Sequence, residues 1–245
     1  MASLQERVYQ VGLFAQIPLA SPNKTLQAVS CLVKGGMFGI ILPWHKQLEE
    51  IIKQIRAQFP QILIGVQGPS QTGQDVFAAG ADFMVGGLPP KNATQGPFLL
   101  RKNSQLYAGK KPVAQYSGKL VLVSDLQQNK WDKIIARAQQ AIEQMLGFTL
   151  CHVGINHPSV EDSLKTARQF EHFFGFPKVD KGGAFFAGPY IESMKKMFYG
   201  AHGHIAIGTN CPTRAAWYLA QRGARFNWKS ADCNPWYLAR GLFAR

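Results

Sequence analysis

The chain has 245 residues, of which 46% are hydrophobic and 17% charged, so it can bury one large core or two modest ones. It contains no run of eighteen apolar residues, and its N-terminus, MASLQERVYQ, lacks the basic start and apolar stretch of a signal peptide. These features argue against a membrane span and against secretion, and they predict a cytoplasmic, reducing location. The widely spaced cysteines are then expected to be free thiols: Cys31, Cys151, Cys211 and Cys233.

The net charge is +13, from 27 basic and 14 acidic residues. Residues 1–90 carry 6 basic and 5 acidic side chains, residues 91–146 carry 9 and 3, and residues 147–245 carry 12 and 6. Such an excess favours a polyanion, a phosphorylated ligand or an acidic protein as partner. A generally basic, soluble surface explains the charge equally well, because the basic residues are dispersed and form no single run.

The first 90 residues alternate short apolar strands with amphipathic helices. The strand GLFAQIPLA precedes the helix SPNKTLQAVSCLVKGG, for which Ser21 is a suitable N-cap and Pro22 a suitable first residue. Further strands are FGIIL, QILIGV and DFMVGG, separated by the helices HKQLEEIIKQIRAQFP and SQTGQDVFAAG. This alternation predicts a parallel sheet, curved or barrel-like, with ligands at the carboxyl ends of its strands.

The alternation breaks after residue 87, where a dense turn region, LPPKNATQGPF, follows the fourth strand without a helix. The next segment, LLRKNSQLYAG, is interpreted as a helix and KPVAQY as a weak strand. A clear amphipathic helix follows in DKIIARAQQAIEQML.

The pattern changes near residues 146–149, which predicts one domain over 1–146 and a second over 147–245. The second begins with the strand FTLCHVGINHP and the helix SVEDSLKTARQFEHFFGF, for which Ser159 is the expected N-cap. Strand-like GAFFAGPYIESMKK and GHIAIGTN follow, and the helix CPTRAAWYLAQRGA is expected to start at Asn210 or Thr213. The order predicts an α+β domain with two similar halves.

The first block resembles the 2-keto-3-deoxy-6-phosphogluconate / 4-hydroxy-2-oxoglutarate aldolase family. The segments that carry the resemblance are LVKGGMFGIIL, QFPQILIGV and VFAAGADFMVGG. The resemblance implies a class I aldolase, a lyase with a (β/α)8 TIM barrel that is usually trimeric. Such an enzyme needs a Schiff-base lysine and an acid/base carboxylate.

The sequence departs from this family at its catalytic positions. Ile41 stands where the family has its catalytic glutamate, and His45 stands where it has the carboxylate-binding arginine. The segment ATQGPFLLRKNSQLYAG aligns best with the family's seventh unit, so units five and six, with the Schiff-base lysine, are missing. The resulting fold class is α/β, an incomplete (β/α) aldolase-type barrel with no catalytic residue to nominate. The neighbouring lysines Lys91, Lys110 and Lys111 are better interpreted as loop residues.

Two further expectations follow from the shortened barrel. The altered phosphate turn leaves a weak set of candidate anion ligands, namely Thr94, Gly96, Lys110 and Lys111. A barrel without two units cannot close with the same stagger, so it should expose sheet edges and apolar helix faces. Those surfaces predict a protein partner or a homo-oligomer.

The second block resembles glyoxalase-type, vicinal-oxygen-chelate domains, which some bacterial aldolases carry as a C-terminal fusion. The segments concerned are MLGFTLCHVGINHPSVEDSLKTARQFEHFFGF, YIESMKK and HGHIAIGTN. By this resemblance His152, Glu192 and His204 are metal ligands for zinc, nickel, manganese or iron. No fourth ligand follows Asp232. The alternative is that the two histidines are inherited strand residues of an inactive module.

Basic residues alternate with aromatic ones near the C-terminus, a composition that can bind nucleic acid. The candidate residues for this are Arg214, Arg222, Arg225 and Lys229. Core packing of the aromatic side chains is the simpler explanation.

These features favour a non-catalytic descendant of an aldolase–glyoxalase fusion, a pseudoenzyme that acts as a binding or structural subunit and requires no cofactor. The first alternative is an enzyme, either an aldolase-like lyase or a metal-dependent glyoxalase-type enzyme. The second is a basic protein associated with nucleic acid.

Overall fold

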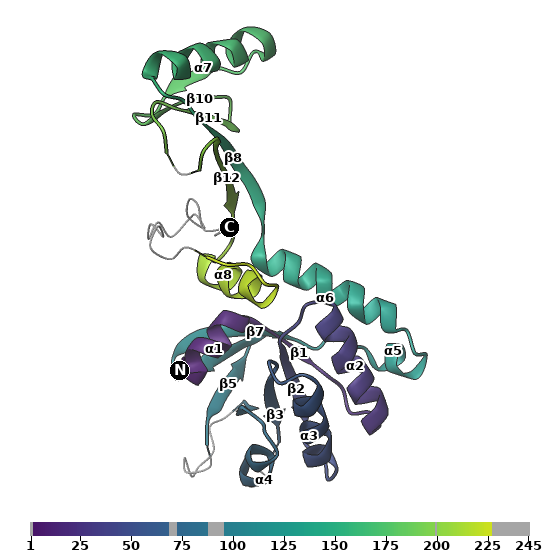
Figure 1. Ribbon diagram of the computed structural model, residues 1–245. Helices are drawn as coiled ribbons and strands as arrows, with labels where there is room; N and C mark the ends of the chain where they lie inside the picture. Colours follow the sequence, from purple (N-terminus) through teal and green to yellow (C-terminus); the bar gives the residue numbers. More distant parts are fainter. Residues whose placement is uncertain (1, 69–72, 88–95, 199, 227–245) are drawn as a thin grey trace. The chain divides into compact units, whose positions relative to one another are not determined.

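The computed structural model describes residues 2–68, 73–87, 96–198 and 200–226 (Figure 1). The chain divides into two compact units, Met1–Met145 and Leu146–Arg245, one residue from the boundary expected from the sequence. No helix in the described ranges is long and apolar enough to cross a membrane.

The first unit is a closed barrel in which the strands are paired in chain order. Its strands are β1 (Leu13–Gln16), β2 (Gly39–Pro43), β3 (Leu63–Gln67), β4 (Phe83–Gly86), β5 (Phe98–Lys102), β6 (Gln105–Ala108) and β7 (Lys111–Ser117). Its helices are α1 (Leu4–Val11), α2 (Pro22–Lys34), α3 (Leu48–Gln58), α4 (Gly73–Ala78), α5 (Val123–Gln127) and α6 (Trp131–Leu146), the last of which crosses the boundary between the units.

The first four strands pair in parallel and are connected by helices, which confirms the alternation expected from the sequence. Each helix turns one apolar face to the sheet. In α3, for example, Leu48, Ile51, Ile52 and Ile55 are all buried. Figure 1 shows α2, α3 and α4 on the outside of the barrel strands. The local pattern of apolar spacing therefore decides this half of the barrel.

The barrel has seven strands, fewer than the eight of a (β/α)8 barrel, but it is closed, so the expectation of exposed sheet edges in this unit was wrong. The segment interpreted as a helix forms β5 and β6, an antiparallel hairpin, and β7 pairs antiparallel with β6 and parallel with β1. The turn consists of Asn103 and Ser104, both at positive φ (47° and 60°), the backbone of a two-residue hairpin turn. Two antiparallel connections, β5 to β6 and β6 to β7, complete the barrel. The barrel therefore has no free edge and does not present the sheet edges expected as an interface.

Two aromatic rings fill the centre of the barrel. Phe14 on β1 and Phe83 on β4 meet edge to face with ring centroids 5.5 Å apart, although their strands are not neighbours. Glycines make room for them: a Cβ on Gly39 would lie 2.7 Å from Cδ1 of Phe14, and one on Gly65 would lie 2.7 Å from Cζ of Phe83. The interior of the barrel is therefore a packed apolar core.

Helix α1 had no counterpart in the sequence interpretation, although its start carries a capping box. The Ser3 hydroxyl accepts from the Glu6 N–H, and the Glu6 carboxylate accepts from the Ser3 N–H. Elsewhere in this unit the half-buried arginines Arg56 and Arg137 each bind a carboxylate, Asp82 and Asp125 respectively. These ion pairs tie α3 to the start of β4 and α5 to α6.

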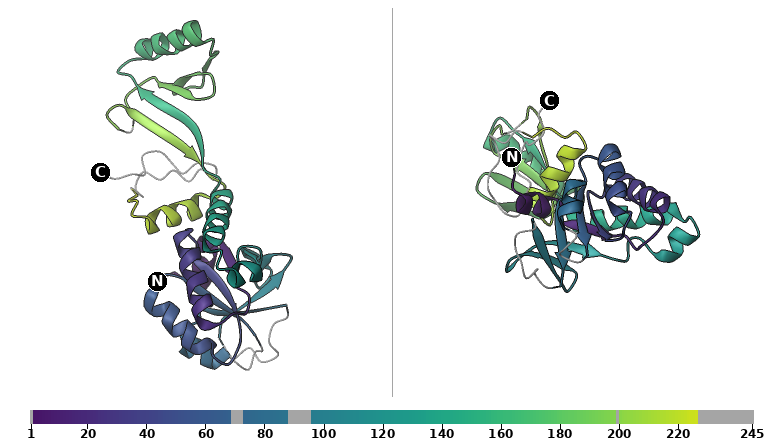
Figure 2. Two further views of the ribbon diagram at one scale, coloured as in Figure 1. Left: turned by 90° about the vertical axis from the view of Figure 1, so that its right-hand side faces the viewer. Right: turned by 90° about the horizontal axis from the view of Figure 1, so that it is seen from below.

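The second unit contains a five-stranded sheet in the order β12–β8–β11–β10–β9. Its elements are β8 (Thr149–Asn156), α7 (Val160–Phe174), β9 (Lys178–Asp180), β10 (Ala184–Ala187), β11 (Ile191–Met194), β12 (Gly203–Gly208) and α8 (Pro212–Gln221). The long strands β8 and β12 lie side by side and antiparallel (Figure 2), whereas β8 and β11 are parallel.

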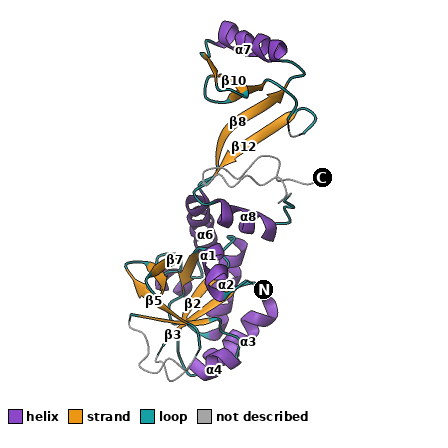
Figure 3. Ribbon diagram, turned by 90° about the vertical axis from the view of Figure 1, so that its left-hand side faces the viewer, coloured by secondary structure: helices purple, strands orange, loops and turns teal. Residues whose placement is uncertain are grey.

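Helix α7 covers one face of β9, β10 and β11 (Figure 3). Ser159 caps it as expected, and two hydrogen bonds of 2.8 Å join Ser163 of the helix to Ser193 of β11. The N-cap of α8 is Cys211, so the expected start at Asn210 or Thr213 was wrong. Pro212 occupies the first helical position, as Pro22 does in α2, and this sets the start of the helix. Of the expected second half, the described residues contain β12 and α8; residues 227–245 lie outside the described ranges.

Candidate metal centre

Three strands of the second sheet bring His152, Glu192 and His204 together. Glu192 on β11 lies opposite Gly154 on β8, which in turn lies opposite His204 on β12. His152 precedes Gly154 by two residues on β8 and so belongs to the same face. Because the next residue after Glu192, Ser193, bonds to α7, the three side chains lie on the face that the helix does not cover.

Gly154 makes this arrangement sterically feasible. A Cβ at position 154 would lie 2.7 Å from Nε2 of His204 and closer still to two other ring atoms. The imidazole therefore rests directly over the glycine backbone. The sequence gives no signal for this role of Gly154, because the role depends on pairing with a strand about fifty residues away.

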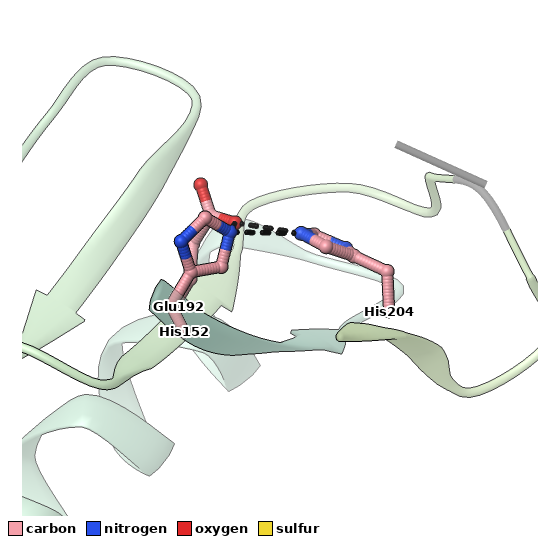
Figure 4. Close-up of side chains that lie close together, drawn as sticks. All are labelled: His152, Glu192 and His204. Atoms are coloured by element: carbon pink, nitrogen blue, oxygen red, sulfur yellow. Dashed lines mark hydrogen bonds and ion pairs between the residues drawn. The ribbon is translucent and has the colours of Figure 1, made fainter. Parts of the chain in front are cut away.

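The three side chains point their polar atoms at one another (Figure 4). Oε2 of Glu192 lies 3.0 Å from Nε2 of His152 and 3.0 Å from Nε2 of His204. The two Nε2 atoms are 3.1 Å apart. Within the described ranges, this is the group of histidine, cysteine and acidic side chains whose ligand atoms could hold a metal ion.

The Glu192 carboxylate is 8% exposed and remains ionised. Burial raises the pKa of Glu192, but hydrogen bonds from His152 and His204, with their positive charge when protonated, outweigh burial and lower that pKa from 4.5 to about 2. The site is therefore an anionic oxygen between two imidazole nitrogens.

The three contacts of this triangle cannot all be hydrogen bonds at once. Oε2 can accept from both rings only if each Nε2 carries a hydrogen, and the Nε2–Nε2 contact of 3.1 Å then sets two donors against each other. Nδ1 of His204 is also buried without a hydrogen-bond partner in the described part of the chain. A cation between the three atoms would accept a lone pair from each, so the donor set fits a metal ion better than it fits a proton network.

Two aromatic rings flank the histidines of the site. Phe186 lies edge to face with His152 at 5.7 Å, and Phe198 lies 6.3 Å from His204, measured between ring centroids. Nδ2 of Asn156 donates to the carbonyl oxygens of Phe198 (3.2 Å) and Gly200 (2.8 Å), which fixes the loop before β12. These contacts hold the imidazoles in place.

The structure places the residues that the sequence compares with aldolase positions. Ile41 on β2 is fully buried, whereas the family resemblance implies a glutamate there. Lys102 on β5 and Lys111 on β7 are the lysines of the barrel strands, and both are exposed. Lys91 lies outside the described residues.

The candidate anion residues do not form a turn before a helix. Gly96 (φ 97°) packs against the Phe77 ring and leads into strand β5, so no helix N-terminus follows it. Lys110 and Lys111 are exposed at the β6–β7 turn, and Thr94 lies outside the described residues. This site stays a prediction.

The candidate nucleic-acid residues lie in and after α8. Arg222 is exposed and donates to the Tyr218 hydroxyl at 3.1 Å, with its guanidinium 4.7 Å from the centre of that ring. Arg225 is exposed and Arg214 is half-buried, while Lys229 lies outside the described residues. Nucleic-acid binding also stays a prediction. Of the cysteines, Cys31, Cys151 and Cys211 form no disulfide within the described residues, and Cys233 lies outside them.

No protein-family model and no curated protein matches the chain. Among solved structures, a KDPG aldolase from Legionella pneumophila, with pyruvate captured as a covalent carbinolamine intermediate, is similar over 57% of this chain and 98% of its own, at 11% identity and a TM-score of 0.47. A 4-hydroxy-2-oxoglutarate / phosphogluconate-type aldolase from TTHB1 is similar over 41% and 54%, at 15% identity and a TM-score of 0.34. A designed cube-shaped protein cage is similar over 30% and 29%, at 20% identity and a TM-score of 0.28. The structural neighbours of this chain thus include KDPG aldolases, at low identity and over part of its length.

Proposed function

We propose that the chain binds one divalent transition-metal ion through Nε2 of His152, Oε2 of Glu192 and Nε2 of His204, and that its barrel does not work as an aldolase. The observation that carries this proposal is the convergence of the three ligand atoms to 3.0–3.1 Å from one another. The protein then acts by binding, as a non-catalytic subunit.

The size of the triangle bears on the ion. Ligands on one face of an octahedral ion with bonds of about 2.1 Å lie about 3.0 Å apart, and those of a tetrahedral ion lie about 3.4 Å apart. The distances of 3.0–3.1 Å are thus short enough for one ion to contact all three atoms. Manganese, iron, nickel and zinc all accept two imidazoles and a carboxylate, and such an ion supplies Lewis-acid chemistry to an oxygen ligand in its open positions.

The second candidate is a metal-dependent enzyme of the glyoxalase type. It is favoured by the order β8–α7–β9–β10–β11, with all three ligands on the face away from the helix. The family resemblance implies four ligands, and the described residues offer three. Binding is therefore the more direct conclusion.

The absence of aldolase activity is supported by the buried Ile41 and by the exposure of Lys102 and Lys111. A Schiff base needs a lysine inside the barrel beside a proton-transferring group. Incubation of the full chain with pyruvate and borohydride, followed by mass spectrometry, should add no pyruvyl group to any lysine. A single modified lysine would overturn this part of the proposal.

Elemental analysis of the purified full chain tests the metal site. After incubation with manganese or zinc and removal of free metal, we expect about one ion per chain. Glu192→Gln and His204→Ala should lower the affinity at least about 100-fold, because each removes a ligand from a three-ligand set. His172→Ala is the matched control, since His172 lies on α7 and outside the triangle. Equal metal content in all variants, or none in the unaltered chain, would refute the site.

Oligomerisation and polyanion binding are separate proposals with separate tests. The homo-oligomer expectation is supported by β9 and β12, which are the edge strands of the second sheet among the described residues, since the closed barrel has no edge. Size measurement of the native protein tests it, and an isolated monomer would exclude it. Retention on RNA that falls steeply with salt would favour the nucleic-acid alternative.

A further inference from the structure

A polar cluster lies at the carboxyl ends of the barrel strands, apart from the metal triangle. Gln16 is the last residue of β1 and Gln67 the last of β3, while Arg101 and Tyr116 are each next to last in β5 and β7. The pairings of β1, β3, β5 and β7 give these four strands the same direction, so all four residues lie at one end of the barrel.

The contacts within this mouth cluster (Gln16, Gln67, Arg101 and Tyr116) cross the barrel interior. Nε2 of Gln16 donates to Oε1 of Gln67 at 3.0 Å, although β2 separates their strands. Nη1 of Arg101 donates to the same Oε1 at 2.8 Å and lies 3.5 Å from Oε1 of Gln16. Side chains of strands that are not neighbours can meet in this way only inside the barrel.

Among the described residues, the partners of Arg101 are all neutral. Apart from the two glutamines, its guanidinium carbon lies 5.4 Å from the centre of the Tyr116 ring. No carboxylate in the described ranges is within ion-pair distance of Arg101, in contrast to Arg56 and Arg137. A guanidinium has five N–H donors, and in the described ranges only Nη1 of Arg101 donates a hydrogen bond.

The surroundings limit what can approach this cation. Below the cluster the interior is apolar and filled by Phe14, Ile41 and Phe83, each fully buried. The glutamine acceptors and the tyrosine ring fix the plane of the guanidinium. Among the described residues, its remaining N–H groups have no acceptor and are therefore suited to a ligand at this end of the barrel. A planar guanidinium edge matches two oxygens of one oxyanion.

We propose that the barrel mouth binds a small oxyanion, a carboxylate or a phosphate monoester, on Arg101, with Gln16, Gln67 and Tyr116 as positioning residues. The cation comes from the hairpin strand β5, in the segment that replaces the regular βα units. This site does not depend on the metal site, and it makes the barrel a binding module without a reactive lysine.

The test uses the full chain and two probes, inorganic phosphate and malonate, with malonamide as a neutral control. Isothermal titration should show saturable one-to-one binding of at least one anion and none of malonamide. Phosphate binding alone identifies a phosphate site, and malonate binding alone identifies a carboxylate site. If neither anion saturates a single site, the proposal is wrong.

Variants locate the site. Arg101→Met should weaken anion binding at least about tenfold, because a charged hydrogen-bonding partner is lost. Lys102→Met is the matched control, since the adjacent lysine is exposed, and it should bind as the unaltered chain does. Glu192→Gln should also leave anion binding unchanged, which separates this site from the metal site. Equal affinity in Arg101→Met and the unaltered chain, or an equal loss in Lys102→Met, would overturn the assignment.

A measurement on the unaltered chain tests the site even if a variant fails to fold. The side-chain amide NMR signals of Gln16 and Gln67 should shift during the titration and saturate with the calorimetric dissociation constant. Signals that do not move while the anion binds would place it elsewhere and refute the proposal.

Discussion

Each of the two units contains a cluster of polar side chains, and the central charged group differs in sign between the two clusters. In the barrel mouth, Arg101 is a cation with amide and aromatic partners. In the second unit, the Glu192 carboxylate lies between two imidazole nitrogens. The first cluster is thus built around a cation and the second around a carboxylate. The comparison teaches that the surplus charge within a cluster, more than the fold around it, decides which ligand it suits.

The two units also differ in how they use glycine. In the barrel, Gly39 and Gly65 make room for the core rings of Phe14 and Phe83. In the second unit, Gly154 makes room for the ring of a candidate ligand, His204. A methyl group should therefore damage packing in the first unit and metal binding in the second.

The largest expected effect is that of Gly154→Ala. The new Cβ overlaps the His204 ring, so the ring must leave the triangle, and we expect metal affinity to fall at least about 100-fold. The free energy of unfolding should also fall by about 1–3 kcal/mol from overpacking. Metal titration and chemical denaturation measure the two effects. Gly183→Ala is the control, because a Cβ there meets no described atom within 4 Å. Unchanged metal affinity in Gly154→Ala would contradict the geometry.

Gly65→Ala should destabilise the barrel without affecting the metal site. Its Cβ would lie 2.7 Å from Cζ of the fully buried Phe83, so we expect a loss of about 1–3 kcal/mol in the free energy of unfolding. Gly118→Ala serves as the comparison, since its nearest atom is 3.8 Å away. Denaturation by urea measures the loss, and elemental analysis should still find bound metal. Loss of metal in Gly65→Ala would show that the two units are not independent.

The smallest expected effect is a pH dependence of the metal-free protein. The pKa of Glu192 is lowered from 4.5 to about 2, so its ionised form stabilises the fold above pH 4.5 and this stabilisation is lost as the pH falls towards 2. Between about pH 7 and about pH 3 the loss should reach at most about 2 kcal/mol. Denaturation of the unaltered chain and of Glu192→Gln at both pH values measures it. A pH dependence equally steep in both proteins would assign the effect to other groups.

Much of the barrel could be predicted from the sequence because its signals are local. Apolar spacing in α3 and the N-cap Ser21 with Pro22 in α2 are both present in the structure. The capping box of α1, formed by Ser3 and Glu6, is also a local sequence signal, although no helix was predicted there. Helical and strand periodicity also mark α6 and β8 correctly.

The closure of the barrel could not be predicted in the same way. Leu99, Leu100 and Leu106 fit a helix as well as two short strands, and the hairpin depends on Ser104 at φ 60°, a conformation that serine rarely adopts. Arg101 was therefore placed on a helix, and its contacts with Gln16 and Gln67 were invisible. The metal triangle came from family-like motifs, whereas the role of Gly154 required the register of β8 against β12.

Anomalous X-ray scattering from crystals of the full chain grown with manganese or zinc is the most direct test of the metal site. Data at the absorption edge should show one strong peak about 2.1 Å from Nε2 of His152, Oε2 of Glu192 and Nε2 of His204. A peak only at other histidines, such as His157 or His202, or no peak between the three atoms, would contradict the account.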